Sequence, residues 1–210
     1  MATNSSSRQS GPRGEATPGS LAAQYRIGAT VGVLAAVVGY LTTVLLTATR
    51  ALDVVSGGPV AADGLPGWRA VGWLFYNAHG VRVRFVSADG VSTVDFIEAG
   101  GGSLAVLYLL PPVVLLLAGA VVAARVGASG PRQGMTAGAT VLTGYGGALV
   151  LGVVPLGGSL GPYTAGPALP LLAAVGYPLA FGTMGGFAAA ALSVPTAAER
   201  PRGPTDATEE

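Results

Sequence analysis

The sequence predicts an all-α membrane protein, a four-transmembrane-helix bundle that carries a small extracellular cap made of one helix and a β-hairpin. Half of the 210 residues are apolar and only 10% are charged, whereas about 25% of a soluble domain is charged. The charged residues also gather in a few clusters that long uncharged runs separate. These two observations predict the bundle, and an Asp-Gly dipeptide between two alternating segments predicts the hairpin.

The uncharged runs are long enough to cross about 30 Å of hydrocarbon at a rise of about 1.5 Å per residue. We expect a membrane domain over residues 25–194, with spans at about 27–49, 103–124, 134–156 and 168–193. Pro111 and Pro112 should kink the second span. Pro178 is a candidate break in the fourth span, of the kind that transporters use at binding sites, although proline also occurs in ordinary spans.

Both ends of the chain are predicted to be disordered cytoplasmic tails, over residues 1–24 and 195–210, because they hold too few apolar residues to form a core. Orientation follows from the arginines near the span ends. With both termini inside, the inner arginines are Arg8, Arg13, Arg26, Arg125, Arg132, Arg200 and Arg202, and the outer ones are Arg50, Arg69, Arg82 and Arg84. The inner excess predicts a multi-pass protein of the cell membrane with both termini in the cytoplasm.

The outer segment, residues 51–102, is the only stretch long enough to fold outside the bilayer. Within it, GWRAVGWLFYNAH (residues 67–79) has apolar residues at helical spacing and is too short to cross. Its Trp and Tyr residues are typical of the membrane interface. We expect this helix and a hairpin over residues 81–97 to form a cap.

The hairpin signal is VRVRFVSADGVSTVDFI, which alternates with a period of two around Asp89-Gly90. If Asp89 and Gly90 form the turn, Arg84 lies opposite Asp95 as a cross-strand ion pair. One face of the hairpin is then apolar and must rest on the helix or on the bilayer, because an isolated hairpin is marginally stable.

Small residues recur at a spacing of four in three of the spans, which allows helices to approach closely in lipid. The stripes are Gly28, Gly32 and Ala36; Gly144, Ala148 and Gly152; and Gly182, Gly186 and Ala190. They serve helix packing within the chain or, alternatively, a homo-oligomer formed through these helix faces.

No ionisable residue lies inside a span, which argues against a proton relay, a voltage sensor or an ion-coupled carrier that uses buried carboxylates. With no cysteine and one histidine, we expect no catalytic, cofactor-binding or metal-binding residues and no enzyme. The near-neutral charge gives no nucleic-acid signature. The bilayer is the expected partner.

The candidate cap or interface residues are Trp73, Tyr76, Asn77, His79, Arg84 and Asp95. His79 is interpreted as a hydrogen-bonded structural histidine at the membrane surface, with an external pH sensor or a metal ligand as the alternative. The charged residues around it, Arg69, Arg82 and Arg84 among them, are interpreted as surface charges rather than a substrate clamp.

The strings VGWLFYNAH (residues 71–79) and LYLLPPVVLLLAG (residues 107–119) resemble a group of small, uncharacterised multi-pass membrane proteins of halophilic archaea that are loosely labelled transporter-like. The resemblance implies a transporter or permease-type subunit and no established site residues. The alternative is a non-transporting membrane protein whose outer cap binds a partner or the cell envelope. A polar path through the spans would favour the first, and a sealed bundle would favour the second.

Overall fold

The computed structural model describes residues 18–48, 67–88, 90–157, 163–164 and 168–193. It confirms the predicted fold class, because four helices are long and apolar enough to cross a membrane and a small hairpin accompanies them. These candidate spans are Leu21–Thr47, Gly102–Arg125, Pro131–Leu156 and Ala168–Leu192.

The first span belongs to helix α1, Pro18–Thr47. The helix includes residues 18–24, so the expectation that disorder extends to residue 24 is wrong. A proline is well tolerated at a helix start, where its missing N–H has no intrahelical partner to lose. The remainder of the expected N-terminal tail, residues 1–17, and the C-terminal tail, residues 195–210, lie outside the described residues.

The second span changes helix type at the prolines. A 3₁₀ helix, η1 (Gly102–Leu109), runs directly into the α-helix α5 (Leu110–Arg125). Pro111 and Pro112 therefore occupy the first turn of α5, where a proline removes no helical hydrogen bond.

The third and fourth spans are also irregular. The third consists of α6 (Pro131–Ala139) and α7 (Val141–Gly157), which meet at Thr140. The fourth begins with α8, passes through a π-helical stretch and ends with α9; their bounds are Ala168–Tyr177, Pro178–Gly182 (η2) and Thr183–Leu192. The candidate break at Pro178 is thus a local widening of a continuous helix, as expected where a proline cannot donate to the preceding turn.

The cap contains the expected helix, α3 (Gly67–Ala78), and the expected hairpin, β1 (Val83–Ser87) with β2 (Gly90–Val94). Two further elements were not predicted. A short helix, α4 (Phe96–Gly100), follows the hairpin. A two-residue strand, β3 (Tyr163–Thr164), comes from the connection between the last two spans and pairs with β1, so the sheet order is β2-β1-β3.

The hairpin register differs from the predicted one. Arg84 pairs with Thr93 and Ser87 pairs with Gly90, so the turn lies one residue earlier than expected. Asp95 is consequently beyond the end of β2 and does not face Arg84. Its carboxylate instead accepts hydrogen bonds from the N–H groups of Ile97 (2.9 Å) and Glu98 (3.3 Å) as the N-cap of α4.

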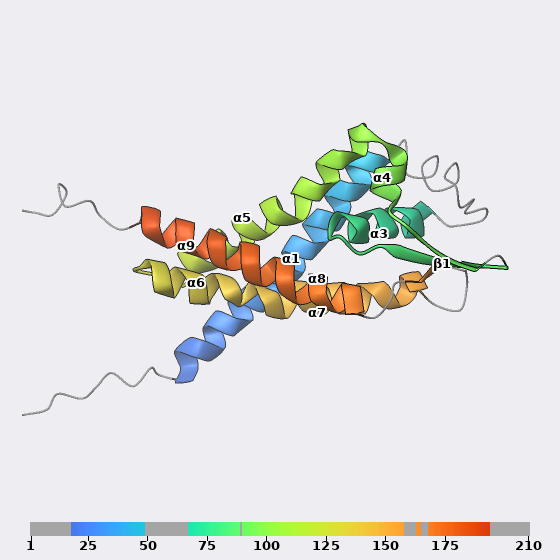
Figure 1. Cartoon of the computed structure of the whole chain (residues 1–210). Coiled ribbons are helices and arrows are strands. Elements are labelled where there is room, and N and C mark those ends of the chain that lie inside the picture. The colour runs from blue at the N-terminus through green and yellow to red at the C-terminus, as the bar shows by residue number, and fades with distance from the viewer. Residues whose placement is uncertain (1–17, 49–66, 89, 158–162, 165–167, 194–210) are drawn as a thin grey trace, which may run out of the picture.

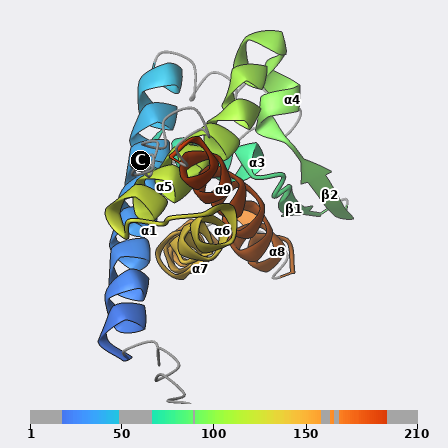
Figure 2. The same ribbon diagram turned by 90° about the vertical axis from the view of Figure 1, so that its left-hand side faces the viewer.

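The described chain ends and the hairpin lie at opposite ends of the bundle (Figure 1). Figure 1 also shows α6 and α9 running side by side, while α1 crosses the other helices obliquely. Viewed along the bundle, α1 stands at the outside, in contact with α5 and α7 (Figure 2). An even number of spans explains why the start of α1 and the end of α9 share one side.

Glycines lie at the close contacts between these helices, which we call the glycine seams. A Cβ added at Gly119 or Gly138 would overlap the carbonyl oxygen of Gly182, so the second and third spans both touch the backbone of the fourth. Gly32 likewise lies against the backbone of Val141 and Tyr145, where α1 meets α7. Of the predicted stripe residues, Gly32 and Gly182 are therefore packed within the chain, which is the first of the two uses predicted for the stripes.

Candidate functional site

The cap helix α3 is almost completely covered by protein. Trp73 and Leu74 are fully buried, and Tyr76 is 2% exposed. Its contacts are with α1, α4, η1 and α7, so this amphipathic helix uses its apolar residues to join the cap to the spans. Because α3 is one turn of loop away from the hairpin, whatever fixes α3 also fixes the sheet.

His79 makes the most specific of these connections. Its Nδ1 lies 2.7 Å from the carbonyl oxygen of Phe75, and its Nε2 lies 2.8 Å from the hydroxyl of Tyr145 in α7. A carbonyl can only accept, so Nδ1 carries the proton and Nε2 accepts from the Tyr145 hydroxyl. The ring also contacts Tyr177 of the fourth span, at 5.3 Å between centroids. We call His79, Tyr76, Tyr145 and Tyr177 the His79 cluster.

Burial governs the protonation of the cap residues in this cluster. The pKa of His79 falls to about 4 because burial penalises the imidazolium, although the hydrogen bond to Phe75 acts in the opposite direction. Burial raises the pKa of Tyr76, whose hydroxyl donates to the carbonyl of Leu149. Both side chains are neutral near pH 7 and act there as fixed hydrogen-bonding groups.

Asn77 connects the remaining parts of the cap. Its amide nitrogen donates to the carbonyl of Val81 at 2.7 Å, and its oxygen accepts from the N–H of Phe96 at 2.9 Å. One fully buried side chain thus links α3 to the start of the hairpin and to the start of α4. Asp95, the neighbouring candidate residue, is the N-cap of that same helix.

Arg69 is buried rather than a surface charge, which corrects the expectation for this residue. Its exposed fraction is 7%, its guanidinium donates to the carbonyl of Pro155 at 3.0 Å, and it lies 5.3 Å from the centre of the Trp68 ring. Within the described part of the chain, its Nε and the indole N–H of Trp73 are buried polar groups without a hydrogen-bond partner. Such groups cost free energy.

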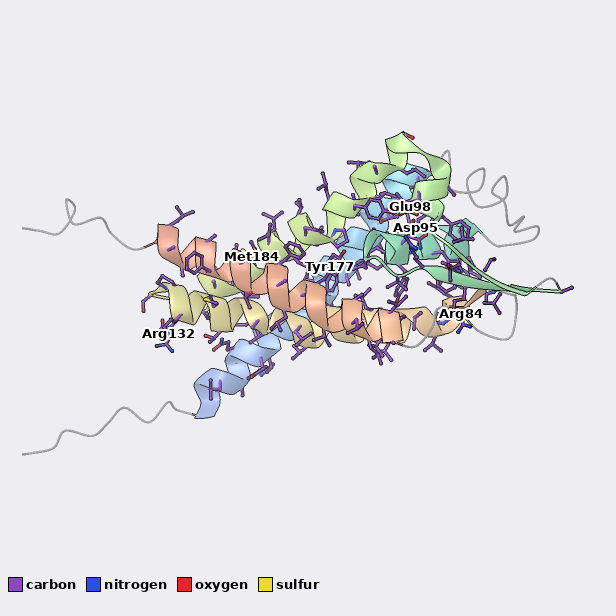
Figure 3. The ribbon with its side chains drawn as sticks, in the orientation of Figure 1. Arg84, Asp95, Glu98, Arg132, Tyr177 and Met184 are labelled. Atoms are coloured by element: carbon purple, nitrogen blue, oxygen red, sulfur yellow. The ribbon has the colours of Figure 1, made fainter. Side chains whose placement is uncertain are left out.

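Arg84 stands apart from the His79 cluster. It is exposed on β1, and Figure 3 shows it at the hairpin end of the molecule, away from Tyr177. Arg82 and Glu98 form an exposed ion pair at 3.5 Å, which contributes little to stability. The structure therefore brings together Trp73, Tyr76, Asn77 and His79, places Asp95 beside Asn77, and leaves Arg84 on the surface.

Two cavities border the cluster. One, of about 320 Å³, lies between α1, α3 and α7, with Tyr40, Phe75 and Tyr76 in its wall. The other, of about 370 Å³, is a groove along the fourth span that His79, Tyr177 and Phe181 line. Aliphatic and aromatic side chains dominate both linings, so these cavities suit apolar groups rather than ions.

The hydrogen bonds of this site are structural: they attach the cap to the membrane spans. Among the described residues, no three metal-binding side chains lie close enough to hold an ion. A neutral histidine between a backbone carbonyl and a tyrosine hydroxyl has both nitrogens engaged. What the arrangement accomplishes is to hold the cap rigidly on the third and fourth spans.

Sequence reasoning identified His79 but missed its partners. Tyr145 is 66 residues away in the chain and directly follows Gly144, a residue of the stripe predicted to serve helix packing. A polar aromatic residue at the centre of an apolar span was the available signal, because a buried tyrosine hydroxyl needs a hydrogen-bond partner.

Residues 5–193 match a described protein family, the "Family of unknown function (DUF7978)". The chain belongs to this family. No curated protein and no solved structure matches the chain. Membership in DUF7978 covers the four spans and the cap together, and the resemblance to transporter-like proteins of halophilic archaea stays a prediction.

Proposed function

We propose that this DUF7978 protein is a non-transporting membrane protein whose rigid outer cap receives an extended segment of a partner protein along the edge of strand β2. Both termini lie in the cytoplasm in this proposal, as the arginine distribution predicts. The observation that carries it is that β2 is an edge strand among the described residues, in a sheet that is joined to the membrane domain.

The edge strand lacks the usual protection. β2 is an outer strand of the sheet, and Val91 is 57% exposed. Its sequence, GVSTV, contains no charged residue and no proline, which are the features that normally prevent an edge from adding a strand. The hairpin also projects beyond the helices (Figure 1). This geometry suits recognition by β-augmentation, in which main-chain hydrogen bonds supply the affinity.

The hydrogen-bonding pattern between β1 and β2 identifies the residues of β2 whose backbone groups point away from β1 and can pair with a partner strand. Ser87 pairs with Gly90 across two intervening residues, and the pair that flanks a two-residue turn exchanges hydrogen bonds. Because hydrogen-bonded and non-hydrogen-bonded pairs alternate in an antiparallel ladder, the backbone groups of Val91 and Thr93 point toward the open edge.

Two further observations support a static scaffold. The contacts of His79, Asn77 and Arg69 fix the cap to the spans and to itself. In addition, Gly119 and Gly138 bring the second and third spans into backbone contact with Gly182 of the fourth. Close seams of this kind hold helices together and leave little room for a hydrated path between them.

A photo-crosslinking amino acid at Val91, introduced into the full chain in its native membrane, tests the proposal. Val106, a valine of similar exposure on the second span, is the matched control position. We expect a discrete adduct from Val91 that Val106 does not form. Thr93→Pro in the same chain should abolish the adduct, because proline removes the outward N–H at that position.

Two outcomes would contradict strand addition: equal crosslinking from both positions, or an adduct that survives Thr93→Pro. An adduct formed by the purified chain alone would identify the partner segment as β2 of a second copy. Such pairing is compatible with the ladder, because an antiparallel alignment that places Val91 opposite Thr93 brings the outward-pointing backbone groups of both copies together.

A permease-type subunit is the second candidate, favoured by the π-helical stretch Pro178–Gly182 beside the groove that His79 lines. Irregular helices of this kind occur at transporter binding sites. Reagent accessibility of cysteines at Gly176 and Ala180 distinguishes the candidates. A solute path would expose them to a water-soluble thiol reagent, whereas a scaffold would leave them in lipid.

The orientation has its own test. Single cysteines at Ser92, in β2, and at Ser129, between α5 and α6, are straightforward to introduce because the chain has no cysteine. An impermeant reagent applied to intact cells should label Ser92→Cys and spare Ser129→Cys. The reverse pattern would place the cap in the cytoplasm.

A further inference from the structure

We infer that the groove between α1 and α5 is a binding site for a membrane lipid with an anionic headgroup, whose phosphate lies between Arg26 and Arg125. The groove has a volume of about 630 Å³. Residues of α1 and α5 line it, and these two helices contact each other where α1 stands at the outside of the bundle (Figure 2). It is separate from the cap and from the edge of β2.

The groove has the dimensions of one leaflet. Its α1 wall begins at Ala23, and the part from Arg26 to Val38 has a rise of about 18 Å at about 1.5 Å per residue. Half of the hydrocarbon core of a bilayer is about 15 Å thick. An acyl chain that enters the groove at the arginine end therefore reaches roughly the middle of the membrane.

The wall of the groove is apolar below the arginines. Aliphatic side chains such as Leu34, Val114 and Leu117 line it, and its floor is made by the buried alanines Ala35 and Ala118. Small residues in the floor leave a channel wide enough for a chain, flanked by larger residues at the rims. A hydrocarbon chain fills such a channel better than water does.

The charges are concentrated at one end. Arg26 and Arg125 both line the groove there, and none of the described residues that line it is acidic. Within the described ranges, neither arginine forms an ion pair; the pair present joins Arg82 and Glu98 at the cap. Basic pockets between spans bind anionic headgroups, because a phosphate satisfies the arginines through charge-assisted hydrogen bonds.

Space for the headgroup adjoins the arginines. A second cavity, of about 480 Å³, is also lined by Arg125, and its wall includes the polar side chains of Gln24, Gln133 and Thr136 together with four apolar residues. Polar groups next to a cationic pair suit a hydrated headgroup rather than a second acyl chain. The two cavities together have the profile of a phospholipid: charged and polar at the membrane surface, apolar toward the centre.

Selective lipid binding by the full chain tests the inference. The protein is reconstituted in nanodiscs of mixed phosphatidylcholine and phosphatidylglycerol, and the lipids that remain bound after release are measured by native mass spectrometry. We expect retention of phosphatidylglycerol over phosphatidylcholine. Arg26→Gln and Arg125→Gln should each weaken phosphatidylglycerol retention by about fivefold.

Arg132→Gln is the matched control, because Arg132 lies at the same end of the molecule (Figure 3) but does not line the groove. It should change retention little. Thr30→Trp provides a second, charge-neutral variant: Thr30 is exposed in the groove wall, and a tryptophan there should displace the chain while both arginines remain.

Three results would overturn the inference. Equal effects of Arg26→Gln and Arg132→Gln would indicate general surface attraction, and equal retention of both lipids would show that charge is not recognised. An efficient disulfide between copies that carry Leu34→Cys, with lipid retention unaffected by Thr30→Trp, would assign the groove to a helix of a second copy. Thermal unfolding of each variant confirms that these exposed substitutions leave the fold intact.

Discussion

The imidazole of His79 accepts a hydrogen bond from the hydroxyl of Tyr145 at 2.8 Å, which fastens the cap to the third span. Both groups are buried, so the bond forms in surroundings where neither partner can turn to water instead. The other imidazole nitrogen is held by the Phe75 carbonyl, which fixes the tautomer. This single contact joins His79, which lies in the connection between the first two spans, to Tyr145 in the middle of the third span.

Removing the hydroxyl should therefore weaken the docking of the cap. Tyr145→Phe leaves the Nε2 acceptor of His79 buried without a donor, which typically costs about 1–3 kcal/mol. We expect a lower free energy of unfolding in detergent and faster amide exchange in α3. Tyr25→Phe, the same substitution at an exposed site on α1, should change neither. Equal stability of the two variants would show that the His79–Tyr145 bond contributes nothing net.

The same histidine predicts a stability that depends on pH. Its pKa of about 4 in the folded protein lies below the ordinary value of about 6.5. The unfolded chain therefore takes up the proton first, so the stabilisation is fully present above about pH 6.5 and is lost as the pH falls toward 4. The aromatic neighbours Phe75, Tyr145 and Tyr177 provide no compensating charge.

Unfolding at pH 7 and pH 5 measures this effect. The wild type should lose about 2 kcal/mol more than His79→Gln over that interval, because the glutamine has no proton to gain. The chain contains one histidine, and the carboxylates titrate in both proteins, so the difference isolates His79. Parallel losses in the two proteins would mean that His79 keeps an ordinary pKa.

The glycine seams make a prediction with opposite signs at two positions. Gly138→Ala would drive a methyl group into the carbonyl oxygen of Gly182, and overpacking of this kind costs about 1–3 kcal/mol. Gly147, in α7, has nothing within 4 Å of an added Cβ, so Gly147→Ala should raise stability by about 0.5–1 kcal/mol. Chemical unfolding of both variants checks the pair. A tolerated Gly138→Ala would show that the spans can separate.

Hydropathy was sufficient to predict the four spans, because uncharged runs bounded by arginines leave few alternatives in a bilayer. The irregularities within the spans were harder to predict from the sequence. The break at Thr140 is not marked by a proline, and a strand of two residues, such as β3, is too short to show a periodic pattern. The partner of His79 could not be predicted because no local rule connects it to Tyr145.

The hairpin shows a different limit. Asp89-Gly90 located the turn correctly to within one residue, but each residue of error shifts every cross-strand pair. The prediction made Arg84 and Asp95 partners by charge. In the structure, the Asp95 carboxylate instead accepts hydrogen bonds from the backbone N–H groups at the start of α4. A helix N-cap stabilises a protein more than an exposed ion pair does.

Disulfide formation distinguishes the two registers. Arg84 and Thr93 face each other in a pair of the non-hydrogen-bonded type, with Cα atoms about 4.5 Å apart, which a disulfide can bridge. The double variant Arg84→Cys/Thr93→Cys should therefore oxidise readily, and Arg84→Cys/Asp95→Cys should stay reduced under the same conditions. Free-thiol titration of the whole chain reports the outcome directly, because no native cysteine interferes. Rapid closure of the second pair and not the first would restore the register that the Asp-Gly signal favoured, and it would move the outward-pointing backbone groups of β2 from Val91 and Thr93 to their neighbours.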